Sequence, residues 1–159
     1  CKKVEIVPLE VIIRNRATGS FVKRYAAEEG KIFKRPTFEL SYKNDDLGDP
    51  LLNDDHALAL ELVTEEELAK IKEQTFLIND LLSKLFDKMN LILVDYKVEF
   101  GRDKDGNILL ADEISPDSMR LWDKDTLKKL DKDRFRQDLG DVMGAYREVL
   151  RRLEKALAE

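Results

Sequence analysis

The prediction of the fold rests on LILVDYKVEFGRDKDGNILLADEI, residues 91–114 of the chain. From residue 94 to residue 100, apolar and charged side chains alternate, which is the pattern of a half-buried strand. Residues 103–106 read Asp-Lys-Asp-Gly, a turn sequence, and residues 107–114 are again mostly apolar. We therefore predict an antiparallel hairpin with strands over residues 91–100 and 107–114.

The first strand of this hairpin should carry its charges on one face. Side chains alternate along a strand, so Asp95, Lys97 and Glu99 share a face. The same alternation assigns Leu91 and Leu93 to the charged face. The core face would carry the remaining apolar side chains: Val94, Tyr96, Val98 and Phe100.

The length of the turn decides which residue lies opposite Asp112. A turn of residues 105–106 alone places Asp112 opposite Glu99, whereas a turn of residues 103–106 places it opposite Lys97. Either even-numbered loop puts Asp112 on the charged face. Two carboxylates and a substrate phosphate are a common set of Mg²⁺ ligands. The alternative interpretation is a solvated face with cross-strand salt bridges.

The rest of the chain mixes strands and helices, which indicates an α+β fold with an antiparallel or mixed sheet and long packing helices. Thr64 begins a capping box ahead of an amphipathic helix that reaches Met89. A second long helix is expected from Asp133 to about Leu157. The other expected elements are strands over 4–14 and 37–42, a short helix over 21–27, loops over 44–55 and 115–120, and a short helix beginning at Asp123.

The charge is distributed unevenly along the chain. Residues 1–44 carry ten Lys and Arg against five Asp and Glu, whereas the whole chain has a net charge of −5. Arg14 ends the first expected strand, and Gly19 and Ser20 begin a helix whose free N–H groups suit a phosphate or carboxylate. This pattern favours an anionic ligand near the N-terminal segment.

Composition excludes several classes of protein. A chain with 43% hydrophobic residues is not disordered, and no apolar run approaches the ~20 residues of a membrane span. One cysteine cannot build a disulfide framework or a multi-cysteine zinc site. The one histidine, His56, has no serine or cysteine motif near it, so no Ser-His-Asp triad is predicted. Net acidity argues against nucleic-acid binding. Because the chain begins with Cys1 and shows no signal peptide, we expect a fragment of a longer, cytoplasmic protein.

Two stretches carry a family resemblance: LVDYKVEFG, residues 93–101, and LADEISPDSMRLWD, residues 110–123. They resemble the signature stretches of the SAICAR synthetase family of purine biosynthesis. Residues 7–20 resemble the substrate-binding segment of that family, and residues 131–136 also match. The resemblance implies a ligase that uses ATP and Mg²⁺ to join the carboxylate of an aminoimidazole ribonucleotide to the amine of L-aspartate.

The resemblance also implies a domain organisation. The family fold has two lobes around an ATP cleft, related to the kinase and ATP-grasp arrangements, and this chain resembles the C-terminal lobe. Residues 1–7 would connect the lobes, and residues 8–159 would form the substrate- and Mg-ATP-binding lobe. The N-terminal ATP-binding lobe would then be absent from this chain. A homo-oligomer is a further expectation, whereas neither nucleic acid nor a membrane is expected as a partner.

The resemblance assigns roles to individual residues. Glu99 and Asp112 would bind Mg²⁺ and ATP, and Lys3 and Ile6 in the connector would lie near the nucleotide. Lys97 and Asp95 are the catalytic candidates, the first neutralising charge and the second a candidate base. The remaining candidates would bind substrate: Arg14, Ser20 and Arg120 at the ribonucleotide phosphate, Asp117 at the aminoimidazole, Lys43 at a carboxylate or phosphate, and Lys132 and Arg136 as weaker anion contacts.

Two other functions remain open at this point. An isolated lobe would bind the ribonucleotide without ligase activity if it cannot position ATP, and ADP release would distinguish the two cases. A structural role is the second alternative, in which the last helix pairs with a partner. Exposed apolar positions beyond one core-facing stripe of that helix would favour this alternative.

Overall fold

The computed structural model describes residues 3–111, 118–130 and 142–158. Within these ranges the chain forms a six-stranded sheet in which every pairing is antiparallel. Its strand order is β3-β2-β1-β4-β5, and β6 also pairs with β4. The strands are β1 (Glu5–Arg16), β2 (Ile32–Tyr42), β3 (Leu51–Leu52), β4 (Leu91–Arg102), β5 (Ile108–Leu110) and β6 (Met119–Asp123).

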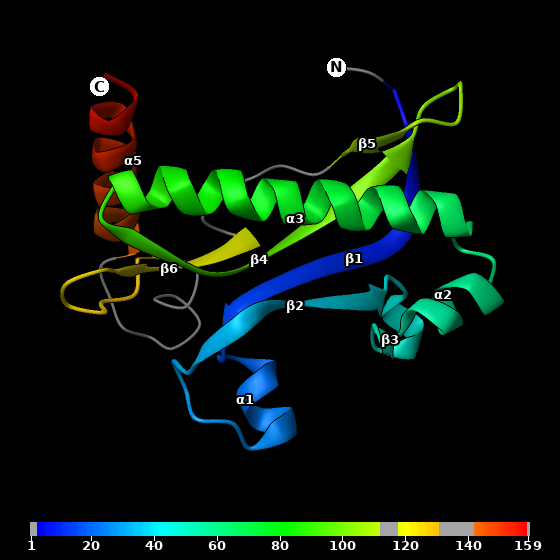
Figure 1. The fold of residues 1–159 in the computed structure, drawn as a ribbon, viewed down its shortest axis with the longest axis horizontal. Helices are drawn as coiled ribbons and strands as arrows, with labels where there is room; N and C mark the ends of the chain where they lie inside the picture. The colour runs from blue at the N-terminus through cyan, green and yellow to red at the C-terminus, as the bar shows by residue number, and fades with distance from the viewer. Residues whose placement is uncertain (1–2, 112–117, 131–141, 159) are drawn as a thin grey trace.

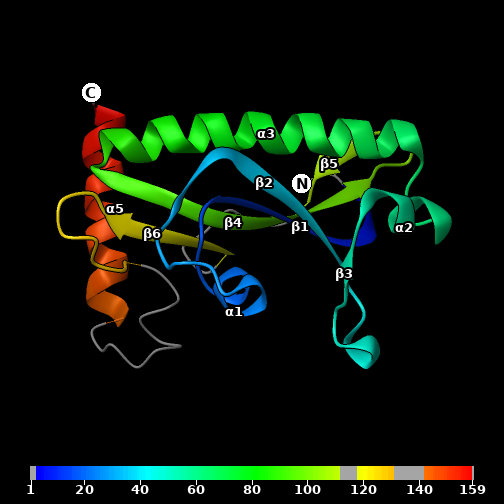
Figure 2. The same ribbon diagram turned by 60° about the horizontal axis from the view of Figure 1, so that its bottom comes forward.

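The helices lie outside this sheet (Figures 1 and 2). The longest helix, α3, runs along one face of the sheet, and α5 stands at one end of it. The helices are α1 (Ser20–Tyr25), α2 (Asp54–Ala59), α3 (Glu65–Lys88) and α5 (Val142–Ala158), with a 3₁₀ turn at Asp45–Leu47. The α+β prediction with an antiparallel sheet and long packing helices is therefore confirmed. None of the described helices is long and apolar enough to cross a membrane.

The capping box predicted at the start of α3 is present. The Thr64 hydroxyl accepts a hydrogen bond from the Glu67 N–H at 3.1 Å, and the Glu67 carboxylate accepts one from the Thr64 N–H at 3.0 Å. From this cap the helix buries Leu68 and Ile71 against the sheet. The Tyr96 hydroxyl donates to a main-chain carbonyl of α3, which ties β4 to the helix.

The predicted core face of β4 is confirmed, but the prediction that Leu91 and Leu93 lie on its charged face is wrong. Tyr96 and Phe100 are each only 1% exposed, as expected. Leu91 and Leu93 also belong to the hydrophobic core cluster rather than to the charged face. The physical reason is a bulge, because β6 pairs with Leu93 and then with Asp95, which leaves one extra residue on β4.

Both predicted registers of the hairpin are wrong. Arg102 pairs with Ile108, so the loop holds five residues instead of two or four. The Asp103 carboxylate accepts hydrogen bonds from the main-chain N–H groups of Asp105 and Asn107, each at 2.9 Å, and stabilises this longer loop. Gly106 supplies the positive φ of 82° that the loop requires. The second strand is also shorter than predicted, because β5 ends at Leu110.

Several boundaries differ from the sequence prediction. The strand expected over 4–14 is the single strand β1, which absorbs Pro8 in a register shift between Ile6 and Glu10. The strand expected over 37–42 begins earlier, as β2. The predicted loop 44–55 contains the 3₁₀ turn, β3 and the start of α2.

The C-terminal third was predicted less accurately. Part of the predicted loop 115–120 belongs to β6, because Met119 and Arg120 pair with β4. Asp123 begins no helix; its carboxylate instead accepts the main-chain N–H groups of Asp125 and Thr126 in a turn. The second long helix is present as α5, and the first part of its predicted range lies outside the described residues.

Candidate functional site

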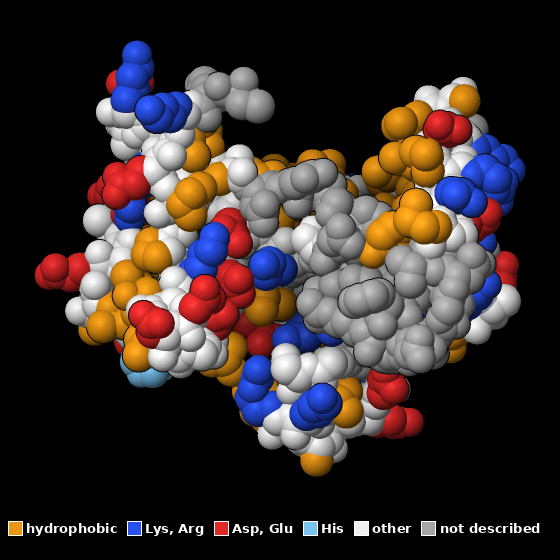
Figure 3. Space-filling model, turned by 180° about the vertical axis from the view of Figure 1, so that it is seen from behind, with side chains coloured by type: hydrophobic (Ala, Val, Ile, Leu, Met, Phe, Trp, Pro, Cys, Tyr) orange, Lys and Arg blue, Asp and Glu red, His pale blue; other side chains and the backbone are white. Residues whose placement is uncertain are grey.

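The antiparallel pairing of β1 with β4 assembles the candidate site. In this register Arg14 lies opposite Asp95, and Glu10 lies opposite Glu99. The neighbouring core side chain of β4, Tyr96, points toward α3, so the charged side chains point to the other face of the sheet. Figure 3 views the molecule from that side and shows acidic and basic side chains intermingled there.

Two arginines converge on one buried aspartate. Asp95 is 3% exposed, and its carboxylate accepts hydrogen bonds from Arg14 at 3.1 Å and from Arg120 at 3.0 Å. Arg14 also donates to the Ser20 hydroxyl at 3.0 Å and forms an ion pair with Glu39. We call Arg14, Ser20, Asp95 and Arg120 the arginine cluster. The structure thus brings together four of the residues that the sequence predicts.

Gly19 fits closely beneath the arginine cluster. Its φ is 55°, and a Cβ at this position would lie 2.7 Å from the Arg120 Nη2 atom. A side chain at residue 19 would therefore strain the backbone and displace the guanidinium. The sequence Gly19–Ser20 therefore suits the cluster, because only glycine fits at residue 19 beside Arg120.

A second group of charges continues along the same face. Lys43 Nζ lies 2.7 Å from Glu99 Oε2, and Lys97 Nζ lies 3.3 Å from Glu10 Oε1 and 3.8 Å from Glu99 Oε1. We call Glu10, Lys43, Lys97 and Glu99 the lysine–glutamate cluster. The two lysines compensate two carboxylates that would otherwise repel each other on adjacent strands.

The lysine–glutamate cluster offers oxygen ligands suited to a hard cation. Glu99 is 7% exposed, and carboxylates are the protein ligands that Mg²⁺ usually takes, together with substrate phosphates. No group of three or more His, Cys, Asp or Glu side chains within the described residues gathers closely enough to hold a metal. Asp112, the second predicted metal ligand, lies outside the described residues. The other predicted site residues outside them are Asp117, Lys132 and Arg136.

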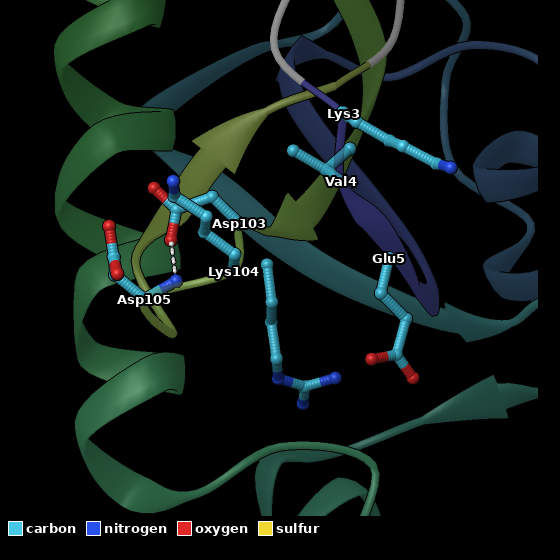
Figure 4. Close-up of a pocket in the computed structure, with 7 residues that line it drawn as sticks. Lys3, Val4, Glu5, Asp103, Lys104 and Asp105 are labelled. Carbon is cyan, nitrogen blue, oxygen red and sulfur yellow. Dashed lines mark hydrogen bonds between the residues drawn. The ribbon is translucent and has the colours of Figure 1, made fainter.

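The start of the chain borders an open pocket of about 680 Å³. Lys3, Val4 and Glu5 form one side of it, and residues 102–105 of the hairpin form the other (Figure 4). Ile6, the other connector residue predicted near the nucleotide, does not line this pocket; it pairs with Gly101 of β4 and is 44% exposed. Within the described residues, Lys3 forms no ion pair with either charged cluster, and Ile6 has no charge.

Sequence reasoning missed Glu10 and Glu39, which contact the predicted site residues Lys97 and Arg14. Each becomes part of the site through strand pairing across a large sequence separation. Glu10 faces β4, which begins about eighty residues later, and no local motif encodes that register. The only signal in the sequence was that each of these glutamates is a charged residue within a mostly apolar strand.

The arrangement is suited to holding anions next to a cation. Guanidinium groups match phosphate and carboxylate oxygens in pairs of parallel hydrogen bonds, and the Asp95 carboxylate presents two of them together. The lysine–glutamate cluster adds two ammonium groups, those of Lys97 on β4 and of Lys43 just after β2, both at the carboxylates of this cluster. The two clusters together can accommodate a ligand with more than one negative group.

Comparison with known proteins gives consistent results. The family described as SAICAR synthetase matches residues 1–153. The chain is 62% identical to phosphoribosylaminoimidazole-succinocarboxamide synthase of Finegoldia magna over 152 residues, which cover 96% of the chain and 66% of that protein. It is 59% identical to the synthase of Methanocaldococcus jannaschii over 152 residues, covering 96% and 63%.

Solved structures show the same fold. The synthase from Ehrlichia chaffeensis has a TM-score of 0.93 at 48% identity, covering 96% of this chain and 65% of that one. A SAICAR synthetase in complex with ADP has a TM-score of 0.92 at 47% identity, covering 95% and 64%. The chain thus spans about two thirds of the length of these relatives. Since the match extends over nearly all of its residues, the chain belongs to the SAICAR synthetase family.

Proposed function

We propose that this chain is the substrate- and Mg-ATP-binding part of a phosphoribosylaminoimidazole-succinocarboxamide synthase. The enzyme would join the carboxylate of 5-amino-1-(5-phospho-D-ribosyl)imidazole-4-carboxylate to L-aspartate, giving SAICAR, ADP and phosphate. In this proposal residues 8–159 are the C-terminal lobe and residues 1–7 the connector. The third of the relatives' length that this chain does not match would supply the N-terminal ATP-binding lobe.

The observation that carries the proposal is the convergence of Arg14 and Arg120 on Asp95, beside Ser20. A ribonucleotide phosphate would take up guanidinium donors that now contact carboxylates, and the Ser20 hydroxyl would add a neutral donor. Asp95 would keep the two guanidinium groups adjacent. Because both of its oxygens already accept hydrogen bonds from Arg120, a positioning role suits Asp95 better than that of a base.

The lysine–glutamate cluster would serve the reacting end of the substrate. Glu99, with Asp112, would hold Mg²⁺, which supplies charge neutralisation at the phosphate oxygens when bound. Lys97 and Lys43 lie within ion-pair distance of Glu99 and would also neutralise negative charge of the carboxylate and phosphates. Positive groups that are already in place are worth most where charge accumulates during transfer.

The proposed reaction has two chemical steps. The substrate carboxylate oxygen attacks the γ-phosphorus of ATP, ADP leaves, and an acyl phosphate forms. The aspartate amine then attacks the acyl carbon, phosphate leaves as the C–O bond breaks, and the amine loses a proton. Fixed cationic groups would lower the barrier of both steps, because in each step negative charge develops on oxygen atoms of the group that leaves.

A second candidate is a binding function without ligase activity, and the partial coverage of the relatives favours it for the chain by itself. Calorimetry with the ribonucleotide and an assay of ADP release with ATP, Mg²⁺, ribonucleotide and aspartate separate the candidates. Binding that is lost in Arg120→Ala supports the substrate site, and ADP release in addition supports a competent ligase. If the ribonucleotide binds neither the wild-type chain nor any variant, the substrate assignment is wrong.

A further inference from the structure

Glu39 of β2 is shared between two arginines that come from different elements. Its carboxylate forms an ion pair with the Nε edge of Arg14 on β1 and lies 3.4 Å from Nη1 of Arg24 on α1. The Glu39 side chain is only 14% exposed, so it is largely removed from bulk water. Hydrogen bonds between charged groups are stronger than those between neutral ones. Glu39 therefore fixes both β1 and α1 to the same strand.

Each nitrogen of the Arg14 guanidinium donates to a protein group. Nε donates to Glu39, Nη1 donates to Asp95 at 3.1 Å, and Nη2 donates to the Ser20 hydroxyl at 3.0 Å. Arg14 is 3% exposed, whereas Ser20 is an exposed residue. A ligand that approaches the arginine cluster would therefore meet the Ser20 hydroxyl before the guanidinium behind it.

The contact from Arg14 decides where the Ser20 hydroxyl can donate. A hydroxyl oxygen that accepts a hydrogen bond from Arg14 directs its own hydrogen elsewhere. Within the described residues, no group accepts that hydrogen. It is therefore available to an oxygen of a bound anion.

These contacts close into a ring through α1. Ser20 and Arg24 are four residues apart on this helix, so they lie on one side of it. Ser20 contacts Arg14, Arg24 contacts Glu39, and Arg14 and Glu39 contact each other. Removing the Glu39 carboxylate would thus loosen both the Arg14 guanidinium and the helix that carries Ser20.

We propose that Glu39 is a positioning residue of the ribonucleotide site and acts through Arg14 on Ser20. The inference rests on the proposed function, which supplies the phosphate that the Ser20 hydroxyl would bind. Glu39 itself contacts no ligand: it holds the guanidinium, and the guanidinium orients the hydroxyl. Arg120, whose side chain is 12% exposed against 4% for Arg14, is then the arginine that contacts the phosphate directly.

The sign of the effect separates positioning from electrostatics. Glu39 carries a negative charge, so Coulomb's law alone predicts that neutralising it strengthens the binding of an anion. Positioning predicts the opposite, because Glu39→Gln replaces a charge-assisted hydrogen bond to Arg14 by a weaker neutral one. Tighter binding of the ribonucleotide by Glu39→Gln than by wild type would overturn the proposal.

Calorimetric titration with 5-amino-1-(5-phospho-D-ribosyl)imidazole-4-carboxylate measures the effect. Glu39→Gln should weaken binding about three- to tenfold, the range for one hydrogen bond to the ligand. Glu29→Gln is the matched control and should bind as wild type does, because Glu29 pairs with Lys129 at 3.3 Å on the same connection between β1 and β2 but takes no part in the ring. Urea denaturation checks that each variant is folded under the conditions of the titration.

A second background tests whether Glu39 acts through Ser20. Ser20→Ala should itself weaken binding about three- to tenfold, and adding Glu39→Gln to it should change the affinity by less than about twofold. A merely structural role of Glu39 would lower the affinity by the same factor in both backgrounds, and that result overturns the proposal. Absence of binding by the wild-type chain overturns the proposed function and this inference with it. Equal binding by wild type and Glu39→Gln overturns this inference alone.

Arg24→Gln tests the other contact of Glu39 with less risk to the fold, because the Arg24 side chain is 33% exposed. Through the ring it should weaken binding about twofold when Ser20 is present and leave the affinity unchanged in the Ser20→Ala background. The loss of a positive charge alone would weaken binding equally in both backgrounds. Equal losses, or no loss in either background, contradict the ring.

Discussion

Glu10 of β1 and Glu99 of β4 lie directly opposite each other, and the Lys97 ammonium lies within 3.8 Å of both carboxylates. Two negative groups on adjacent strands repel unless a cation lies near them. Lys97 therefore lowers the repulsion in the folded chain, besides its proposed role in the reaction.

Replacing Lys97 by methionine should lower the free energy of unfolding by about 1 kcal/mol, because the pair is partly exposed and solvent screens much of the repulsion. Urea denaturation measures the change. Adding Glu10→Gln to Lys97→Met should recover most of the loss, since one of the two opposing charges is then removed. If the double variant is less stable than Lys97→Met, repulsion between Glu10 and Glu99 is not the cause.

Replacing Asp95 by asparagine should have a much larger effect. Arg14 and Asp95 are each 3% exposed, so the substitution removes a buried negative charge that two arginines share and leaves Arg14 with Glu39 as its remaining countercharge. The expected loss of stability is about 3–5 kcal/mol, measured by urea denaturation. Asp87→Asn is the control, because Asp87 pairs with Lys124 at the surface and should contribute less than about 1 kcal/mol. Equal effects of the two substitutions would contradict the assigned role of Asp95.

Replacing Gly19 by alanine should weaken ribonucleotide binding at least tenfold, because its Cβ would displace the Arg120 guanidinium. Calorimetry measures the affinity. Gly48→Ala is the matched control, since Gly48 also has a positive φ, of 72°, but a Cβ added there would meet no atom within 4 Å. Both variants should lose about 1–2 kcal/mol of stability from backbone strain. Only Gly19→Ala should lose affinity; an equal affinity in both variants would exclude Arg120 from the binding site.

Asp123 should contribute stability that depends on pH. The main-chain N–H of Thr126, with the Arg152 guanidinium, lowers the pKa of Asp123 from its ordinary value of 3.8 to about 2. A lowered pKa in the folded state means that the contribution, about 1–2 kcal/mol, is complete above pH 4 and is lost as the pH falls toward 2. Unfolding free energies of wild type and Asp123→Asn should therefore converge over this range. If the difference between wild type and Asp123→Asn is the same at pH 2 as at pH 5, the Asp123 carboxylate does not supply this contribution.

Local signals in the sequence predicted local structure well. Thr64 and Glu67 are three residues apart, and their capping box forms because all of its partners belong to one helical turn. The alternation from Val94 to Phe100 likewise identified a strand and its core face. These predictions needed no knowledge of how distant segments meet.

Features that depend on pairing between distant segments were not accessible in the same way. The bulge near Val94 arises only where β6 meets β4, and it moved Leu91 and Leu93 from the predicted charged face into the core. The five-residue loop depends on hydrogen bonds of the Asp103 side chain, which residue spacing alone does not reveal. The sequence resemblance assigned Arg14, Asp95 and Arg120 to one region, whereas their mutual contacts required the β1–β4–β6 register.

The central position of strand β4 in the sheet has a consequence for how the protein unfolds. It hydrogen-bonds to β1 along one edge and to β5 and β6 at the two ends of the other, and it carries Asp95, Lys97 and Glu99. Elements from the beginning, middle and later part of the chain are therefore held by one strand, whose amides should exchange with solvent only through global unfolding. A partially unfolded form that releases β4 would lose both charged clusters at once. The capacity to bind anions and the folded structure should accordingly be lost together, in a single cooperative unfolding transition.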